Sequence, residues 1–269
     1  MIDPKLQAEL RAKFNPEGSD LRNMQLRMLE MLKYIDRICR ENGIKYWLSS
    51  GTCLGAVRHG GFIPWDDDVD IEMLKDDYSK LEKILRGAAG EYVLQDYKSD
   101  PEYVHVFTKL RDTKSIIKEN NDSDCYNRYN GLYIDLFVIE PSNSKFLFRC
   151  SCSLWGRVIF RCHRVKNKIL RQLYLKVANF LLRKILFPIV RIFNSYPKRN
   201  CFRHVLGSYF IKPRCKSDID EVVYVPFEDV VLPIPKGYDH YLQLIYGEWS
   251  KMPDLDNVED GHIVSYSAI

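Results

Sequence analysis

Residues 63–72 read Ile-Pro-Trp-Asp-Asp-Asp-Val-Asp-Ile-Glu and place four carboxylates within five positions, at the start of an apolar run. Carboxylates this close repel one another and raise each other's pKa, so a cation must offset them unless they lie in water. The pattern predicts a buried strand over 69–74, on which Asp68 and Asp70 share one face. Asp66 joins them if the strand begins early. Two carboxylates at this spacing can hold a divalent cation such as Mg²⁺, which leaves coordination sites for phosphate.

A third acid and a turn of small residues accompany this pair. Asp135 lies at the centre of an apolar strand predicted over 132–139, where an unpaired carboxylate would be costly. It is explained as a third metal ligand or a base, or else as a cap or a partner for a buried Arg or Lys. Ser50, Gly51 and Thr52 stand where a strand ends and a helix begins, so a phosphate could approach the backbone N–H groups there.

The remaining periodicity predicts a mixed α/β (α+β) protein in which helices separate some of the strands. Residues 145–200 differ in kind from the rest and divide the chain into three parts. We expect a catalytic core at 20–144, a helical insertion at 145–200 and a C-terminal segment at 201–269 that packs on the core. Further helices are expected at 20–41, 51–59, 76–86 and 238–246, and strands at 44–48, 92–95, 104–110, 115–117 and 222–225. Prolines at 226, 233 and 235 indicate an irregular wrapped segment.

Charge is distributed unevenly along the chain. Residues 145–200 contain 14 Lys or Arg and no Asp or Glu, so the other residues hold 26 basic against 36 acidic side chains. Large apolar residues interleave with the basic ones, which suits helices on an anionic membrane surface. Packed helices with a solvated basic face are the alternative, and a nucleic acid or another polyanion is a third, which we do not expect.

The cysteines and the N-terminus indicate a reducing compartment. Eight scattered cysteines and no secretory signal make reduced thiols in a cytosol the default. No apolar run is long enough for a transmembrane helix. Cys150, Cys152, Cys162 and His163 could be drawn as a metal cluster, but their spacing matches no common zinc pattern.

Residues 50–71, SGTCLGAVRHGGFIPWDDDVDI, resemble the signature of the LicD family of phosphotransferases, which use CDP-activated alcohols and have fukutin and its relatives as distant members. The family pattern runs G-T-x-L-G-A-x-R-H, then a short loop, then P-W-D-x-D-x-D. Residues 109–112, 131–137 and 233–253 also look like family blocks. The resemblance covers about 25–140 and 220–262, and no family motif is visible in the basic segment. The first block is met at Gly51, Thr52, Leu54, Gly55, Ala56, Arg58, His59, Pro64, Trp65, Asp66, Asp68 and Asp70.

This resemblance implies a nucleotidyltransferase-like mixed sheet flanked by helices, with the basic segment as a helical insertion. Mg²⁺ or Mn²⁺ would be held by Asp68 and Asp70 on the diphosphate of a CDP-alcohol, and Asp135 would complete the site or take the proton of the acceptor. The residues expected to bind the substrate phosphates are Ser50, Gly51, Thr52, Arg58, Lys109 and Arg111. An ion pair with Asp66 or Asp67 is the alternative for Arg58, and a solvated strand edge is the alternative for the other two cations.

Residues outside the signature have less certain roles by the same resemblance. His262 could reach the site from the C-terminal stretch. Trp65 is expected to be a packing anchor. If the alcohol is choline, Tyr126, Tyr129 and Tyr133 offer aromatic faces to its quaternary ammonium, although ordinary packing is their alternative role.

The function expected from this resemblance is transfer of an alcohol phosphate, with phosphocholine first among the candidates, from a CDP-alcohol to a glycan hydroxyl. CMP is released, and the acceptor is a cell-surface glycan such as lipopolysaccharide or capsule, or its lipid-linked precursor. We expect the protein at the cytoplasmic face of the plasma membrane, held there by residues 145–200. Nucleotide transfer from a nucleoside triphosphate with release of pyrophosphate is the alternative, and a non-catalytic membrane-bound scaffold is the third.

Overall fold

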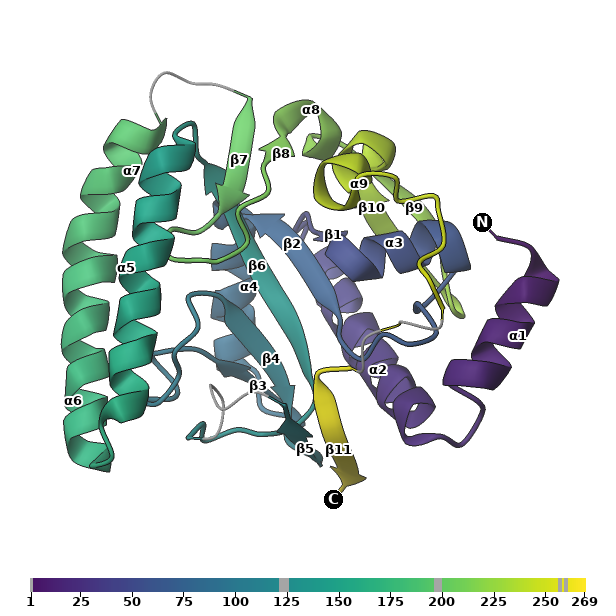
Figure 1. The fold of residues 1–269 in the computed structure, drawn as a ribbon, viewed down its shortest axis with the longest axis horizontal. Coiled ribbons are helices and arrows are strands. Elements are labelled where there is room, and N and C mark those ends of the chain that lie inside the picture. Colours follow the sequence, from purple (N-terminus) through teal and green to yellow (C-terminus); the bar gives the residue numbers. More distant parts are fainter. Residues whose placement is uncertain (1, 121–125, 196–199, 256–257, 259–260) are drawn as a thin grey trace.

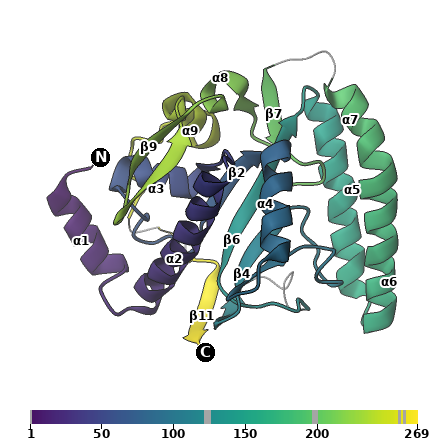
Figure 2. The ribbon, with the colours of Figure 1, turned by 180° about the vertical axis from the view of Figure 1, so that it is seen from behind.

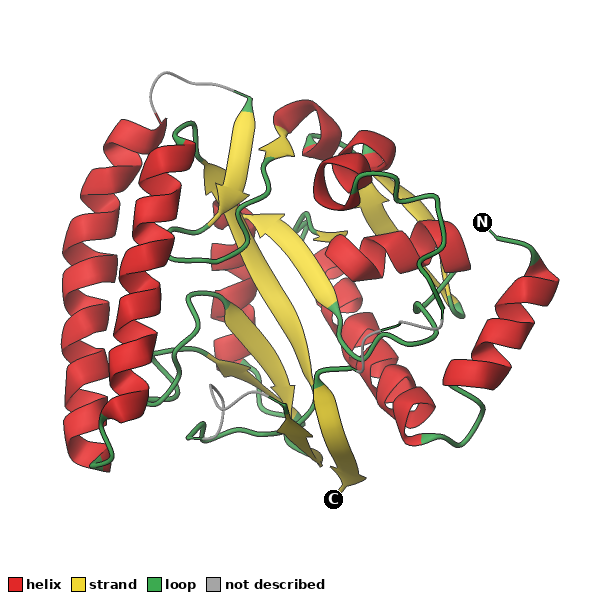
Figure 3. Cartoon of the chain, viewed as in Figure 1, coloured by secondary structure: helices red, strands yellow, loops and turns green. Residues whose placement is uncertain are grey.

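A twisted mixed sheet forms the middle of the molecule in the computed structural model, which describes residues 2–120, 126–195, 200–255, 258 and 261–269 (Figures 1 and 3). The strand order is β1-β2-β6-β4-β3, with β7 beside β6 and β8 beside β7. Only β2 and β6 run parallel among the described strand pairs of this sheet. The predicted α/β class is confirmed. The strands are β1 (Trp47–Leu48), β2 (Asp70–Leu74), β3 (Tyr92–Gln95), β4 (Thr108–Asp112), β6 (Tyr133–Pro141), β7 (Cys201–His204) and β8 (Arg214–Cys215).

Two helices, α2 (Asp20–Glu41) and α4 (Lys75–Gly87), cover one face of the sheet. Figure 2 views the molecule from that side and shows both helices in front of the sheet. The Ser19 side chain caps α2 by accepting the N–H of Arg22, and Asn42 ends the helix, as the sequence predicts. The apolar residues of α2 that face the sheet, among them Met28, Leu32 and Ile35, recur every three or four positions and are buried. Since side chains alternate along a strand, Ile71 and Met73 of β2 lie in this core, whereas Asp70 and Glu72 point to the opposite face.

A helix that the sequence reading did not predict precedes this core. α1 (Pro4–Phe14) begins after Asp3, whose side chain accepts the N–H of Lys5. Glu228 links the helix to the rest of the molecule, because its two oxygens bind Arg11 at 2.8 Å and Arg22 at 2.9 Å. Trp65 packs edge-on against Phe14, which agrees with its predicted packing role.

The proline-rich segment is a regular hairpin, so the prediction of irregular structure there is wrong. β9 (Val222–Phe227) pairs antiparallel with β10 (Val230–Pro235), and Glu228 turns the chain with a positive φ of 53°. A two-stranded ribbon tolerates proline because each strand has one edge that needs no N–H donor. The hairpin packs beside β1.

The C-terminal residues add two helices and one strand to the fold. α8 (Lys216–Ile219) and α9 (Tyr238–Tyr246) follow the main sheet, and α9 begins and ends at the predicted residues. β11 (Ile263–Ala268) pairs antiparallel with β5 (Ser115–Glu119). Elements of the segment 201–269 therefore pack against the rest of the molecule at several places.

The basic segment forms a helical layer along one edge of the sheet. Its helices are α5 (Lys145–Arg164), α6 (Lys168–Asn179), the π-helical segment η2 (Phe180–Leu186) and α7 (Phe187–Ser195). Trp155 of α5 is buried beside Phe148 and donates its indole N–H to the carbonyl of Val104. The strand predicted at 104–110 begins only at Thr108, because residues 104–107 pack against this helical layer instead of pairing. None of the described helices is both long enough and apolar enough to span a membrane.

Candidate active site

Three charged side chains lie in register across three neighbouring strands on the face opposite α2 and α4. Asp70 of β2 pairs with Asp135 of β6, and Asp135 pairs with Lys109 of β4. Lys109 Nζ lies 3.8 Å from Asp135 Oδ1. The pairing of β2 with β6 therefore brings together the two acidic motifs that are 65 residues apart in the sequence.

The loop before β2 adds two more carboxylates to this row. Asp68 precedes the strand, which begins at Asp70, one residue later than predicted. The charges of both Asp68 and Asp66 act on Asp70, so the three carboxylates form one cluster. Asp67 points elsewhere and accepts the N–H of Ile263 at 2.6 Å, as expected from the alternation of side chains.

Burial and mutual repulsion make ionisation of these carboxylates unfavourable. Burial is the main cause that raises the pKa of Asp70 well above its usual range, and the charges of Asp68, Asp135 and Asp66 add to it. Burial also raises the pKa of Asp135 to about 7, although Lys109 opposes the shift. The pKa of Asp68 is raised as well, by burial and by Asp67. A site of this kind favours a bound cation.

Helix α3 (Ser50–His59) begins beside the carboxylate cluster. Ser50 has a positive φ of 46°, and its N–H donates to the hydroxyl of Tyr241. Gly51 lies so close to Asp66 that a β-carbon on it would stand 2.9 Å from Asp66 Oδ2. Thr52 Oγ1 accepts the N–H of Asp70. The start of the helix thus meets the acidic loop, and the Thr52 side chain positions β2.

The signature glycine Gly55 has a structural explanation. A β-carbon there would stand 2.5 Å from the carbonyl oxygen of Gly61 and 3.2 Å from the nitrogen of Ile63. We expect Gly55→Ala to lower the free energy of unfolding by about 2 kcal/mol, because the backbone of the loop must shift.

Urea denaturation measures this effect, with Gly156→Ala as the control. Gly156 lies in α5 with open space around its α-carbon, so alanine there should stabilise the protein by about 0.5–1 kcal/mol. Equal unfolding free energies for the two variants would contradict the explanation.

The two cations of β4 are buried, which excludes the alternative of a solvated strand edge. Lys109 Nζ lies over the ring of Tyr133 at 3.4 Å and 3.7 Å from Glu119 Oε1. Arg111 donates to Gln95 Oε1 at 2.7 Å and to the carbonyl of Gly131 at 2.8 Å. Arg111 therefore holds the sheet together, and Lys109 is the cation of this pair that borders the carboxylates.

The structure supports neither a choline-binding role for Tyr133 nor an ion pair of Arg58 with an acidic side chain. Tyr133 is buried and its ring already contacts the cations of Lys109 and Arg111, which argues against its binding a choline headgroup. Arg58 donates to His59 Nε2 and to the carbonyls of Trp249 and Lys251. No ion pair between Arg58 and an acidic side chain is found among the described residues, although the charge of Asp66 acts on it. Arg58 thereby joins α3 to the C-terminal segment.

The structure adds residues to the site that the sequence reading did not assign. The hydroxyl of Tyr246 lies 3.9 Å from where a β-carbon on Gly51 would stand, and its pKa is raised by burial and by Asp70, Asp66 and Asp68. Tyr246 belongs to the block 233–253, so that motif was the signal for it. The charge of His262 lowers the pKa of the Asp68 carboxyl. This agrees with the suggestion that His262 reaches the site.

A second unassigned group, Glu72, lies two positions after Asp70 on the same face. Its carboxylate binds Arg214 at 2.6 Å and His204 at 2.9 Å, and accepts hydrogen bonds from Trp47 and Tyr241. Since the hydroxyl of Tyr241 also contacts Ser49 and Ser50, this buried network supports the start of α3. The alternation of the strand could have revealed Glu72.

The carboxylate cluster fits a hard cation that shares its coordination with a substrate. Asp135 Oδ1 is buried and accepts no hydrogen bond from the described residues. The oxygens of Asp68, Asp70 and Asp135 do not form a group within 4.8 Å of one another, as a site closed by protein ligands would require. Two carboxylates completed by phosphate oxygens are the usual arrangement for Mg²⁺.

The cysteine cluster considered from the sequence is not assembled. Cys150 is exposed, Cys152 donates its thiol to the carbonyl of Ser208, and Cys162 is buried in an apolar cluster. Over the described part of the chain, the one group of three potential metal ligands within 4.8 Å consists of Cys215, Asp218 and His240.

A family model described as the nucleotidyltransferase domain of LicD, FKTN and FKRP matches residues 43–178. The chain belongs to the LicD family. The LicD domain contains α3, β2, β4 and β6, which carry the carboxylate cluster, and it also extends through α5 and most of α6. The basic segment is therefore partly within the family domain, whereas the motifs alone place the family resemblance at about 25–140 and 220–262 and leave this segment out.

Several characterised proteins share the LicD domain with this chain. The lipopolysaccharide cholinephosphotransferase LicD of Haemophilus influenzae is 27% identical over 260 residues, which cover 90% of this chain and 96% of that protein. Ribitol 5-phosphate transferase FKRP of Homo sapiens is 39% identical over 114 residues, or 42% of this chain and 20% of FKRP. Mannosyltransferase regulator 4 of Saccharomyces cerevisiae is 31% identical over 131 residues, which are 47% and 11% of the two chains. The protein is thus an enzyme, a LicD-type phosphotransferase.

Proposed function

We propose that the protein transfers an alcohol phosphate from a CDP-alcohol to a hydroxyl of a cell-surface glycan or its lipid-linked precursor. Phosphocholine is the first candidate for the group transferred. The observation that carries this proposal is the cluster of Asp68, Asp70 and Asp135 beside the start of α3. The similarity to a cholinephosphotransferase over nearly the whole length of both chains supports phosphocholine as the group transferred.

Asp68 and Asp70 are the residues that would hold Mg²⁺ or Mn²⁺. When bound, the cation neutralises the diphosphate of the donor and the charge that develops on its oxygens. The N–H groups of Gly51 and Thr52 at the start of α3 are proposed to bind phosphate oxygens, because a helix N-terminus attracts anions. Lys109 stands beside Asp135 and adds positive charge at this edge of the cluster.

The proposed transfer is an in-line displacement at phosphorus. The acceptor oxygen forms a bond to the phosphorus distal to cytidine, and the bond from that phosphorus to the oxygen of CMP breaks, so CMP leaves with the electron pair. We propose that Asp135 receives the proton of the acceptor hydroxyl, because its buried carboxylate lies in register with Asp70 and beside Lys109.

We further propose that this reaction takes place at the cytoplasmic face of the plasma membrane, where lipid-linked glycans are assembled. The 14 basic and no acidic residues of 145–200 support an anionic membrane as the partner. No nucleic acid is required by this proposal.

The proposal is tested by measuring CMP release from CDP-choline, CDP-ribitol and CDP-glycerol in parallel, with a membrane glycolipid extract as acceptor and Mg²⁺ or Mn²⁺ present. We expect CMP from one donor, and expect EDTA to abolish it by removing the cation that neutralises the diphosphate. Restoring the metal should restore the activity.

The same assay separates the alternative reaction. Nucleotide transfer would yield pyrophosphate from a nucleoside triphosphate and no CMP from the CDP-alcohols. Pyrophosphate release by folded protein that is silent with every CDP-alcohol would therefore contradict the proposed reaction. Activity unaffected by EDTA would contradict the role of Asp68 and Asp70 as metal ligands.

A further inference from the structure

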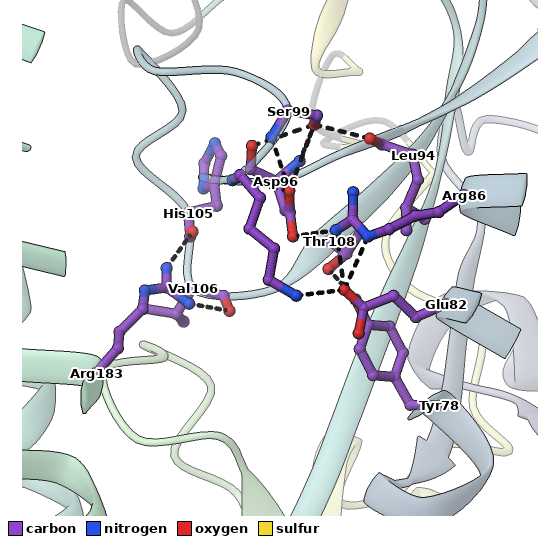
Figure 4. A network of polar contacts seen from close by, with 11 residues as sticks. Tyr78, Glu82, Arg86, Leu94, Asp96, Ser99, His105, Val106, Thr108 and Arg183 are labelled. Atoms are coloured by element: carbon purple, nitrogen blue, oxygen red, sulfur yellow. Dashed lines mark hydrogen bonds and ion pairs between the residues drawn. The ribbon is translucent and has the colours of Figure 1, made fainter. Parts of the chain in front are cut away.

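The helices α6, η2 and α7 continue into one another and present polar residues to the protein. Arg171 is buried against Glu102, with Nε 2.6 Å from Oε2. Arg183 donates to the carbonyls of His105 and Val106, and Figure 4 shows its guanidinium apart from the ion pairs around Glu82. Arg191 of α7, eight residues after Arg183, binds Glu140. The inner face of this long helix is therefore unusually rich in charge.

The opposite face of the same helix is apolar and exposed, and we call it the outer apolar face. Large aliphatic and aromatic side chains recur on it every three or four residues. The exposed fraction is 76% for Ile169, 70% for Ile192 and 69% for Phe193. Figures 1 and 2 both place α6 at the outer edge of the molecule. The outer apolar face consists of Ile169, Leu170, Leu173, Val177, Phe180, Leu181, Ile185, Leu186, Ile189, Ile192 and Phe193.

The helix carries apolar side chains on both sides, because Leu175, Ala178 and Phe187 are buried beneath it. A usual amphipathic helix, in contrast, exposes mainly polar side chains. The helix runs from Lys168 to Ser195 and is roughly 40 Å long at 1.5 Å per residue. An apolar surface of this extent on a soluble domain marks a site of contact with a partner.

Charge identifies the partner as anionic. Lys168, Lys176 and Lys184 are exposed along the outer apolar face, and residues 145–200 contain no acidic side chain. Two copies of this face would repel each other, so a second copy of the chain is disfavoured. Phospholipid headgroups with negative charge satisfy the lysines while the hydrocarbon beneath them receives the apolar side chains.

A groove on this face is suited to a hydrocarbon chain. It has a volume of about 580 Å³ and lies between the helix and residues 97–101. Ile169, Leu173 and Phe180 line it, and Lys176 and Lys184 also belong to its lining. The apolar walls and the two cations match the two chemical parts of an anionic lipid.

We propose that the outer apolar face docks the protein on an anionic phospholipid membrane, with α6, η2 and α7 lying in the plane of the interface. This deepens the proposed function, since it names the surface that would bring the enzyme to a lipid-linked acceptor. The earlier expectation from composition involved all of residues 145–200, whereas the structure assigns the contact to one face of one continuous helix.

The test is flotation of the full-length protein with vesicles of phosphatidylcholine, with and without phosphatidylglycerol. We expect the protein to bind only the anionic vesicles, and we expect added salt to weaken this binding. Replacing Lys168, Lys176 and Lys184 together by alanine should lower the partition coefficient about 100-fold. The matched control replaces three exposed lysines elsewhere, Lys80, Lys83 and Lys236, and should bind like the wild type.

A second variant examines the apolar contribution. Ile169→Ser with Leu173→Ser should also lose binding, whereas Val231→Ser, which alters a half-exposed apolar residue of β10, should not. Thermal melting confirms that each variant is folded, which is expected because all these side chains are exposed.

Two results would overturn the docking surface. One is equal vesicle binding by the lysine variant and its control. The other is self-association of the wild type in sedimentation velocity that the Ile169→Ser/Leu173→Ser variant loses. CMP release is measured without vesicles, so a protein that binds vesicles but releases no CMP would contradict only the proposed reaction.

Discussion

Asp70→Asn is expected to lower CMP release by at least about a thousandfold and, at the same time, to raise the melting temperature of the metal-free protein by a few degrees. The first effect follows from loss of a proposed metal ligand. The second follows because burial and the charges of Asp68 and Asp135 raise the pKa of Asp70, so its ionised form destabilises the cluster. The hydrogen bond from the Asp70 N–H to Thr52 is unaffected by the substitution.

The matched control for this variant lies three residues earlier. Asp67→Asn removes one charge from the same acidic stretch, but asparagine retains an oxygen that can accept the N–H of Ile263. We expect this variant to keep most of the activity. If both variants lost activity equally while remaining folded, the total charge of the stretch rather than the position of Asp70 would be responsible, and the proposed metal site would be wrong.

Calorimetry with the cation provides a readout that does not depend on the donor. Mg²⁺ should raise the melting temperature of the wild type, because a ligand that binds only the folded state stabilises it. It should leave that of Asp70→Asn nearly unchanged. A similar Mg²⁺-dependent increase in both proteins would place the cation elsewhere.

Glu72→Ala is expected to destabilise the protein by about 3–5 kcal/mol, the range for removing one partner of a buried ion pair. Glu72 is fully buried, and its loss leaves the guanidinium of Arg214 without its carboxylate. Urea denaturation measures the difference. The matched control is Glu221→Ala, because the ion pair of Glu221 with Lys236 is exposed and solvent-screened, so its loss should change the stability little.

The pH dependence of stability should change with the same substitution. Burial opposes ionisation of Glu72, but Arg214 and His204 overcome it and lower its pKa from the ordinary value of 4.5. The folded form therefore binds the proton more weakly than the unfolded form. The stabilisation is complete above about pH 5 and decreases as the pH falls from there toward the lowered folded pKa. Glu72→Ala should show a flatter decrease of stability over that range.

A double variant tests whether the unpaired charge of Arg214 causes the loss of stability. Replacing Glu72 and Arg214 together by apolar residues of similar size should recover part of the stability, since neither charge is then left unpaired. If Glu72→Ala and Glu221→Ala cost the same free energy, the buried network would not support the fold in the way described.

Both predictions concern the same face of β2, and their opposite signs show how that strand is used. Asp70 is surrounded by like charge and gains stability when it is neutralised. Glu72, two residues on, is surrounded by donors and cations and loses stability when it is removed. One strand thus carries a carboxylate whose charge destabilises the folded protein and another whose charge stabilises it.

The sequence alone determined the family, the order of most helices and strands and the identity of the acidic cluster. These follow from local patterns: helical spacing defines α2 and α9, and the run around Asp68 and Asp70 belongs to the signature of residues 50–71. The motifs also predicted a mixed sheet in which the strand of Asp135 lies next to the strand of Asp70.

Only the tertiary structure decided which charges face the site and which hold the fold. Arg111 has the same sequence signal as Lys109, yet Gln95 and Gly131, both more than 15 residues away, take up its guanidinium. The placement of Tyr246 beside Asp66, Asp68 and Asp70 likewise depends on contacts between segments that are distant in the sequence. Composition showed a basic, apolar segment at 145–200, but the direction of each helix face was set by the carboxylates and carbonyls that its arginines find in the rest of the molecule.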